Sequence, residues 1–310
     1  MKPGAGPGLP EGAVVVTPSV LRAWALPRPG ADADKTARGQ VLVVGGSTDT
    51  VGAVGLAGVA ALRSGAGKLQ VATAGPVAPL LAVTLPEALV TGLAVNDDGA
   101  IVGTSAAAEK VASMVAKARA VLVGPGLSDP DETRPLVDAV LAALPDSAVV
   151  VLDAMAATCG AVLEDGRVPE AFRRVADRAV LTPNPAEAAW LLERSAEEIA
   201  AAPVSDLSRE LADRTGAVVA LRGCTSAPDG RVWFDQTGHA GLGTSGSGDV
   251  ASGIVTGLAA RGADPAQAAV WGVALHAEAG QRLAARMGSL GFLARELLDE
   301  VPAVLRQLEL

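Results

Sequence analysis

The feature that most constrains this chain is the alternation of short apolar runs with segments of helical periodicity. The apolar runs occupy residues 40–44, 69–73, 120–123, 148–152, 179–181, 217–221 and 232–234. The helical segments occupy residues 18–26, 52–63, 105–116, 131–144, 186–194, 196–202 and 204–215, and further helices follow residue 250. Strands that are apolar throughout and alternate with helices form parallel sheets covered on both faces. The sequence therefore predicts an α/β fold with a central, mostly parallel sheet and helices on both faces.

The residues that end these apolar runs indicate where a ligand would bind. Ligands of parallel sheets lie beyond the carboxyl ends of the strands. Glycines and polar residues follow the runs at that edge: Gly45-Gly46-Ser47, Gly124-Pro125-Gly126, Asp153, Asn184, Arg222-Gly223 and a glycine-rich loop near residue 245. Because they converge on one edge, they predict a single site there.

The domain organisation follows from the continuity of the pattern. The chain has 310 residues, half of them apolar, and strand and helix patterns run from residue 40 to residue 308 without a linker. Residues 1–12 are rich in glycine and proline and are expected to form a disordered tail. We therefore expect one domain over residues 13–310.

Composition excludes several classes of protein. A net charge of −9 argues against nucleic acid or an anionic membrane as the main partner, and an aromatic content of 2% argues against base-stacking platforms. The two cysteines, Cys159 and Cys224, are too few for a disulfide framework or a cysteine metal site. No apolar run is long enough for a membrane span, and the first residues do not resemble a signal peptide. A cytoplasmic protein is expected.

Residues 241–250 (Gly-Leu-Gly-Thr-Ser-Gly-Ser-Gly-Asp-Val) are the most informative motif. Glycines let backbone N–H groups converge, and the first turn of a helix leaves several of them unpaired, so the motif predicts an anion site. A carboxylate at its rim, Asp249, is suited to be a base for a hydroxyl that receives phosphate. The alternative is a helix start that Ser247 or Asp249 caps, with no chemistry. No Lys follows the last glycine, so this is not the common nucleotide-binding loop.

Together these motifs resemble the NAD(P)H-hydrate dehydratases, which are ribokinase-like enzymes that use ADP or ATP to repair hydrated nicotinamide cofactors. The resemblance runs from about residue 35 to about residue 285. It rests on residues 41–47, Gly52-Ala53, residues 61–67, residues 124–127, residues 152–154, Thr182-Pro183-Asn184-Pro185 with Glu187, residues 221–223 and residues 241–250. The glycine loop is shared with other ribokinase-like kinases, whereas the Gly-Gly-Ser and Thr-Pro-x-Pro-x-Glu elements are typical of this family.

The resemblance implies a reaction and a set of site residues. The hydroxyl of the hydrated ring would be phosphorylated and phosphate then eliminated, with Asp249 as the catalytic base. Ala53, Gly126, Asn184 and Asp249 would bind the hydrated cofactor. The nucleotide would be bound by Arg222, Gly223, Cys224, Thr225, Ser226, Thr244, Ser245, Gly246, Ser247 and Gly248. ADP or ATP would be the co-substrate and Mg²⁺ the metal.

Several residues keep two interpretations. Asn184 either contacts the substrate or forms a local turn, and Glu187 either binds Mg²⁺-linked water or begins a helix. Asp153 is either a helix cap or a site group. His239 is expected at the edge of the site, and His276, in an apolar helix, is expected to be a packing residue whose hydrogen bonds are satisfied. Lys35 and Arg38 either reach phosphate or remain solvated.

The chain departs from the family pattern at four positions. The family usually has His at Asn184, Lys at Arg222, Asp at Met155 and Gly at Ser245. Arg keeps the charge of Lys but changes its geometry, so substrate and nucleotide preference are open.

Two other functions remain open at this point. One is a ribokinase-like small-molecule kinase acting on a thiazole, pyrimidine or sugar alcohol, and the other is an inactive nucleotide-binding relative. Without the epimerase domain of fused relatives, the chain is expected to perform the dehydratase step alone. A homo-oligomer is expected, since related proteins are tetramers, with the apolar helix 266–285 as one surface for subunit packing.

Overall fold

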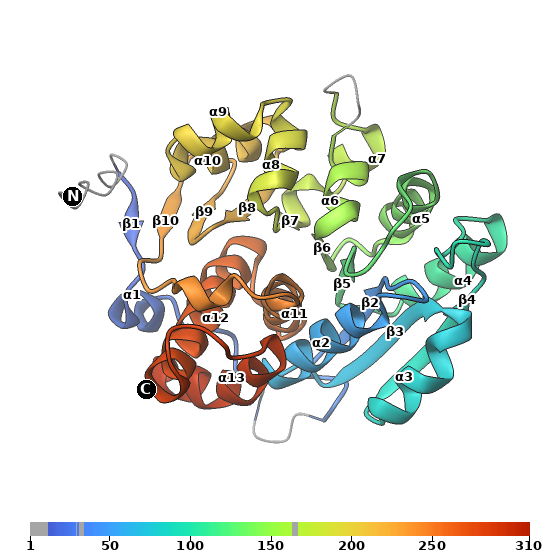
Figure 1. Ribbon diagram of the computed structural model, residues 1–310, viewed down its shortest axis with the longest axis horizontal. Coiled ribbons are helices and arrows are strands. Elements are labelled where there is room, and N and C mark those ends of the chain that lie inside the picture. The colour runs from blue at the N-terminus through green and yellow to red at the C-terminus, as the bar shows by residue number, and fades with distance from the viewer. Residues whose placement is uncertain (1–11, 29, 31–33, 163–166) are drawn as a thin grey trace.

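The computed structural model describes residues 12–28, 30, 34–162 and 167–310. They form one ten-stranded sheet in the order β1-β10-β9-β8-β7-β6-β5-β2-β3-β4 (Figure 1). β9 runs antiparallel to both of its neighbours, and every other pair of adjacent strands is parallel. The predicted mostly parallel sheet is confirmed.

The elements have the following bounds. The strands are β1 (Val14–Val15), β2 (Gln40–Val44), β3 (Lys68–Ala74), β4 (Ala88–Leu93), β5 (Ala120–Val123), β6 (Val149–Leu152), β7 (Ala179–Leu181), β8 (Val218–Leu221), β9 (Cys224–Ser226) and β10 (Val232–Phe234). The helices are α1 (Pro18–Ala23), α2 (Val51–Arg63), α3 (Ala78–Thr84), α4 (Ser105–Val115), α5 (Pro130–Ala143), α6 (Ala154–Gly160), α7 (Glu170–Arg173), α8 (Pro185–Leu192), α9 (Ala196–Ala201), α10 (Val204–Thr215), α11 (Ser247–Ala260), α12 (Pro265–Met287) and α13 (Ala294–Glu309). Short 3₁₀ turns are η1 (Gly75–Val77), η2 (Ala176–Arg178) and η3 (Ala240–Leu242).

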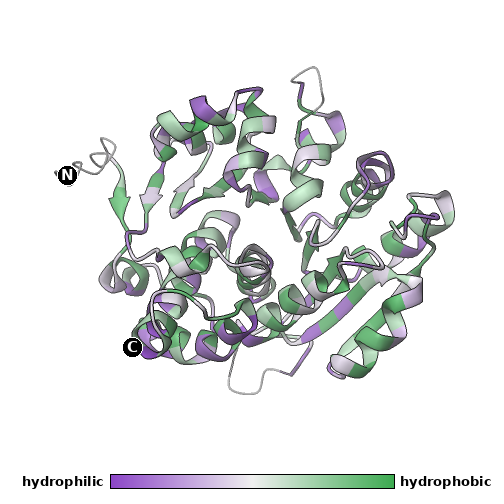
Figure 2. Cartoon of the chain, in the orientation of Figure 1, coloured by the Kyte–Doolittle hydropathy of each residue, from purple (hydrophilic) through white to green (hydrophobic). Residues whose placement is uncertain are grey.

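The sheet has a hydrophobic core on each face because its strands are apolar on both sides. Alternate residues of β2 point in opposite directions: Val41 and Val43 pack with α1, α2, α3, α11, α12 and α13, whereas Leu42 and Val44 pack with α4 to α10. The two groups of helices lie on opposite sides of the sheet in Figure 1. Hydrophilic residues lie on helices outside the sheet, for example on α5 (Figure 2).

Close packing of α11 on α2 fixes where the glycine loop lies. A Cβ on Gly253 would be 2.3 Å from the carbonyl oxygen of Ala57, and one on Gly257 would be 2.4 Å from that of Ala61. Only glycine permits backbones to approach this closely. The two helices therefore meet along their length, and the residues that precede α11 lie beside α2.

Most predicted elements are confirmed within one or two residues at each end. Thr17 caps α1 as expected, accepting a hydrogen bond from the Val20 N–H. β1, α3, β4, α6, α7 and β9 were not predicted. These are short segments of two to seven residues, too short to carry a clear periodic pattern of their own. The expectation that residues 266–285 pack between subunits is wrong, since α12 is largely buried in the core of its own chain.

The predicted tail falls almost wholly on residues 1–11, which lie outside the described residues. Within the described ranges, no helix combines the length and the apolar composition that crossing a bilayer requires.

Candidate active site

The site lies where the strand order reverses. β2 pairs with β3 on one side and with β5 on the other. Parallel sheets bind ligands where the strand order reverses in this way, beyond the carboxyl ends of the strands. The Gly46 N–H donates to the Pro125 carbonyl over 2.7 Å, and the Thr50 hydroxyl donates to the Gly126 carbonyl over 2.6 Å. Gly46 has φ +80°, and a Cβ there would be 2.6 Å from the Thr73 hydroxyl. The two glycine turns predicted from sequence thus lie against each other at the carboxyl edge of the sheet.

The amino end of α11 forms an open anion site. Gly246, with φ +86°, is the N-cap and supplies no capping side chain. The Ser247 N–H bonds the Thr244 carbonyl and the Val250 N–H bonds the Gly246 carbonyl, leaving the amides of Gly248 and Asp249 in positions that have no partner within a helix. Such amides and the helix dipole attract an anion. The alternative prediction that Ser247 or Asp249 caps this helix is wrong, since the N-cap is Gly246, whereas binding of an anion here stays a prediction.

Three carboxyl groups from different elements influence one another at this edge. Burial, with the charge of Asp153, raises the pKa of Asp249 to about 7. Burial also raises the pKa of Glu187 to about 7; the Asn184 amide opposes the shift, whereas Asp153 and Asp249 add to it. Burial raises the pKa of Asp153 to about 6, against hydrogen bonds from Thr182 and Ser252. At neutral pH, Asp249 therefore exchanges a proton readily, as a general base must.

Asp153 does not cap α6 with its side chain, and its role as a site group stays a prediction. It precedes α6, but its side chain makes no capping hydrogen bond, and its Oδ1 accepts from the Thr182 hydroxyl over 2.8 Å. The next residue, Ala154, has φ +48°, a strained value for a residue with a side chain. A Cβ on Gly124 would be 1.8 Å from the Asp153 carbonyl oxygen. The backbone at the end of β6 is therefore held tightly against the loop after β5.

Asn184 and Glu187 form a reciprocal cap at the start of α8. The Asn184 side-chain oxygen accepts from the N–H groups of Ala186 and Glu187, and the Glu187 carboxylate accepts from the Asn184 N–H over 2.9 Å. The local-turn interpretation of Asn184 is confirmed. Asn184 is nevertheless exposed at the rim, so a role in binding substrate stays a prediction.

The predicted nucleotide segment at residues 222–226 divides into an exposed turn and a buried strand. Arg222 and Gly223 form the two-residue turn between β8 and β9, both with positive φ. Cys224, Thr225 and Ser226 are buried in β9, and the Ser208 hydroxyl bonds both the Ser226 hydroxyl and the Cys224 sulfur. Arg222 is thus the one exposed side chain among these five residues. Nucleotide contacts by all five of them stay predictions.

Ala53, Thr244 and Ser245 lie at the start of α2 and in the loop before α11. Ala53 is in the first turn of α2. Thr244 and Ser245 line a largely apolar cleft of about 760 Å³ that extends between α2, α3 and the start of α13. This cleft adjoins the anion site on its α2 side.

Arg38, His239 and His276 each have a hydrogen-bond partner in the structure. Arg38 donates to the carbonyls of Gly65 and Ala66, near the amino ends of β2 and β3, so it does not reach the anion site. His239 caps η3, where its Nδ1 accepts from the Gly241 N–H. His276 was expected to be a packing residue whose hydrogen bonds are satisfied, and its Nε2 does lie 2.8 Å from the Ser247 hydroxyl. No sequence signal joined two residues so far apart.

Among the described residues, no group of three or more His, Cys, Asp or Glu side chains is arranged to hold a metal ion. Glu187 already accepts hydrogen bonds from Asn184. A cation carried mainly by nucleotide phosphates needs only one or two protein carboxylates.

The fold and the candidate site define a class of protein: a ribokinase-like α/β protein with a glycine-rich, uncapped helix start and an adjacent buried carboxyl group. The fold is shared with a ribokinase-like superfamily protein of Enterococcus faecalis, at a TM-score of 0.78, with 21% identity over 98% of this chain and 99% of that one. The sequence profile described as NAD(P)H-hydrate dehydratase matches residues 41–303. The chain belongs to this family.

Two relatives support the assignment. The ADP-dependent (S)-NAD(P)H-hydrate dehydratase of Xanthomonas campestris is 45% identical over 94% of this chain and 96% of its own length. The crystal structure of the ADP/ATP-dependent enzyme of Bacillus subtilis, co-crystallised with ATP and Mg²⁺, matches with a TM-score of 0.77 and 30% identity. That match covers 96% of this chain and 99% of that one.

Proposed function

We propose that this protein converts hydrated NADH or NADPH to the dihydronicotinamide form in a reaction driven by ADP or ATP. One observation carries the proposal: Asp249, with a pKa near 7, lies at the open amino end of α11 beside unpaired amides. A base and an anion cradle are what phosphoryl transfer to a hydroxyl requires.

The reaction follows from these two parts. Asp249 takes the proton of the ring hydroxyl while the oxygen of that hydroxyl attacks the terminal phosphorus of the nucleotide. The bond from phosphorus to the leaving nucleotide oxygen breaks in the same step. The Gly248 and Asp249 amides stabilise the charge on the transferred group. The ring nitrogen then expels phosphate, and the adjacent ring carbon loses a proton to form the double bond. Phosphate is a far better leaving group than hydroxide, which is why a nucleotide is consumed.

The remaining site residues have supporting roles in this proposal. Ala53, Gly126 and Asn184 line the position of the hydrated ring and its ribose, and Arg222 binds the nucleotide. Mg²⁺ would arrive with the nucleotide phosphates, near Glu187, and neutralise phosphate charge. The departures at Asn184, Arg222, Met155 and Ser245 preserve the base and the amides, so they alter preference and leave the reaction class intact. We place the reaction in the cytoplasm, where reduced nicotinamide cofactors are used.

The test is an absorbance assay at the reduced-nicotinamide band with hydrated NADH, Mg²⁺, and ADP or ATP. We expect NADH to form only when nucleotide is present. Asp249→Asn should lower turnover by about 100-fold or more while ADP still binds, because proton transfer is lost and the amides remain. A phosphorylated product without NADH would favour the kinase alternative. Unchanged turnover in Asp249→Asn would rule out the proposed base.

We also propose that the protein associates with further copies of itself through α3 and β4. β4 is an edge strand of the sheet, and Leu80, Val83 and Leu89 are 67%, 81% and 60% exposed there. Exposed apolar side chains beside an unpaired strand edge favour a symmetric contact with a second copy. Val83→Glu should shift the mass in sedimentation equilibrium to that of a monomer. Trp190→Glu, an exposed apolar position on the opposite side of the sheet, should not.

A further inference from the structure

One face of α12 supports both ends of the glycine loop. Gly272, His276 and Gly280 are spaced four residues apart and therefore lie on the same side of this helix. A Cβ on Gly272 would be 2.5 Å from Val255 of α11, and one on Gly280 would be 2.6 Å from Leu242 of η3. Leu242 precedes the loop and Val255 belongs to the helix that follows it. The face therefore touches the chain on both sides of the anion site.

His276 lies between these two contacts and reaches the loop itself. Its Nε2 is 2.8 Å from the hydroxyl of Ser247, the first residue of α11. The Ser247 side chain is buried and is directed toward α12. Burial also lowers the pKa of His276 to about 4, so the ring is neutral at physiological pH and one ring nitrogen accepts while the other donates.

This contact matters because a serine at the start of a helix has other options. Its hydroxyl can turn toward a neighbouring backbone amide and compete with a bound anion. With its hydroxyl engaged by His276, Ser247 leaves the Gly248 and Asp249 amides available. The following residues of α11 are held at a fixed distance from α12, and these include the base.

We infer that His276 is a positioning residue: through its hydrogen bond to Ser247 it sets the orientation of the amides that bind the nucleotide phosphate and of the adjacent Asp249. The inference rests on the proposed function, since it assumes a nucleotide at this helix terminus. It assigns a role in binding to a side chain that no nucleotide needs to touch.

The experiment compares four variants by titration calorimetry with ADP and by melting temperature. His276→Phe keeps a planar ring of similar size but removes the hydrogen bond, and Ser247→Ala removes the other partner. Each should weaken ADP binding about 3- to 10-fold, the range expected for one hydrogen bond. Because the two changes break the same contact, the double variant should bind no more weakly than either single one. His276→Gln, whose amide can still bond Ser247, should recover affinity to within about twofold.

Thr256→Val is the matched control. It removes a buried hydroxyl that bonds the Ser252 carbonyl within α11, two turns beyond the loop. We expect it to change the melting temperature without changing ADP affinity.

The outcomes separate this inference from the proposed function. If the wild-type protein binds ADP but His276→Phe binds it equally well, or if the effects of the two single changes add, His276 only packs and the inference is wrong. The proposed reaction then stands. If the wild-type protein binds neither ADP nor ATP, both proposals fall together.

Discussion

At the scale of single residues, the chemistry depends on where carboxyl groups are buried. Sequence alone indicated Asp249, because its motif places an acid at the start of a helix. It left Asp153 open between a helix cap and a site group, and the structure excludes the side-chain cap, because Asp153 accepts a hydrogen bond from Thr182 instead. A strand end looks the same in sequence whether its acid turns toward a helix or toward a neighbouring strand.

The raised pKa values predict how activity depends on pH. Asp249 must be deprotonated to act as a base, so kcat/KM should rise with pH through about 7. The charge of Asp153 contributes to that raised pKa, so Asp153→Asn should move the rise to lower pH. The pH dependence of kcat/KM, measured for the wild-type protein and for Asp153→Asn, gives the position of the rise and its shift.

Asp235→Asn provides a control for this profile. Asp235 is also buried with a raised pKa, but it accepts hydrogen bonds from Thr237, and it is not among the groups that influence Asp249. Asp235→Asn should leave the pH at which kcat/KM rises unchanged. A profile that shifts equally in both variants would contradict the assignment to Asp153.

At the scale of elements, long periodic segments were predictable and short ones were not. α10 and β5 were predicted with their observed bounds, since each carries a complete pattern of its own. β9 has three residues, two of them polar, and becomes a strand only because β8 and β10 pair with both of its edges. α6 starts from the strained Ala154, a conformation that local propensity does not favour.

The β8–β9 turn yields a prediction about strain. Arg222 has φ +47° in a position that favours Asn or Gly. Arg222→Asn should therefore stabilise the protein by about 1 kcal/mol, measured by denaturant unfolding. If Arg222 binds the nucleotide, as proposed, the same change should weaken ADP binding.

Glu193 offers the comparison for this prediction. It has φ +55° at the end of α8, where it pairs with the partly exposed Arg214. Glu193→Asn should also relieve strain but leave ADP affinity unchanged. Equal losses of affinity in both variants would contradict a specific role for Arg222.

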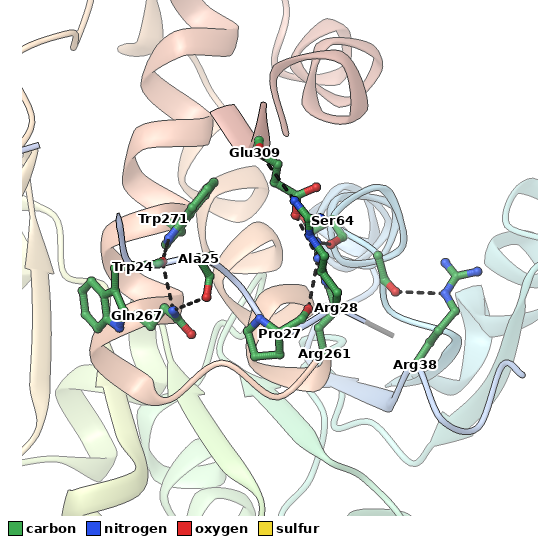
Figure 3. A network of polar contacts seen from close by, with 11 residues as sticks. Trp24, Ala25, Pro27, Arg28, Arg38, Ser64, Arg261, Gln267, Trp271 and Glu309 are labelled. Atoms are coloured by element: carbon green, nitrogen blue, oxygen red, sulfur yellow. Dashed lines mark hydrogen bonds and ion pairs between the residues drawn. The ribbon is translucent and has the colours of Figure 1, made fainter. Parts of the chain in front are cut away.

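At the scale of the whole molecule, a polar network at the end of the sheet opposite the site holds distant segments together. Arg261, whose side chain is 7% exposed, donates to the carbonyls of Pro27 and Ser64 and pairs with Glu309. These contacts join the end of α11 to the loop after α1, the end of α2 and the end of α13 (Figure 3). Nearby, Gln267 and Trp271 of α12 donate to the Trp24 carbonyl.

Loss of this arginine should destabilise the protein without affecting its chemistry. Arg261→Ala leaves two carbonyls and a carboxylate without a partner, and should lower the free energy of unfolding by about 2–3 kcal/mol. Arg63→Ala breaks the ion pair between Arg63 and Asp299, whose side chains are 49% and 77% exposed. It should lower the free energy of unfolding by less than about 1 kcal/mol. Denaturant unfolding compares them, and kcat should be unchanged in both. A large loss of kcat in Arg261→Ala would mean that the network reaches the site.

The sequence by itself determined the strands and helices with strong periodicity, the parallel character of the sheet, the glycine loop with Asp249, and the resemblance to a family that the comparisons bear out. All of these are local patterns, carried by residues near one another along the chain. Tertiary structure alone decided which loops meet at the carboxyl edge of the sheet, which carboxyl groups are buried enough to hold a proton near pH 7, and that His276 reaches Ser247. Burial and long-range contacts depend on what the rest of the chain packs against each residue, and no local pattern contains that information.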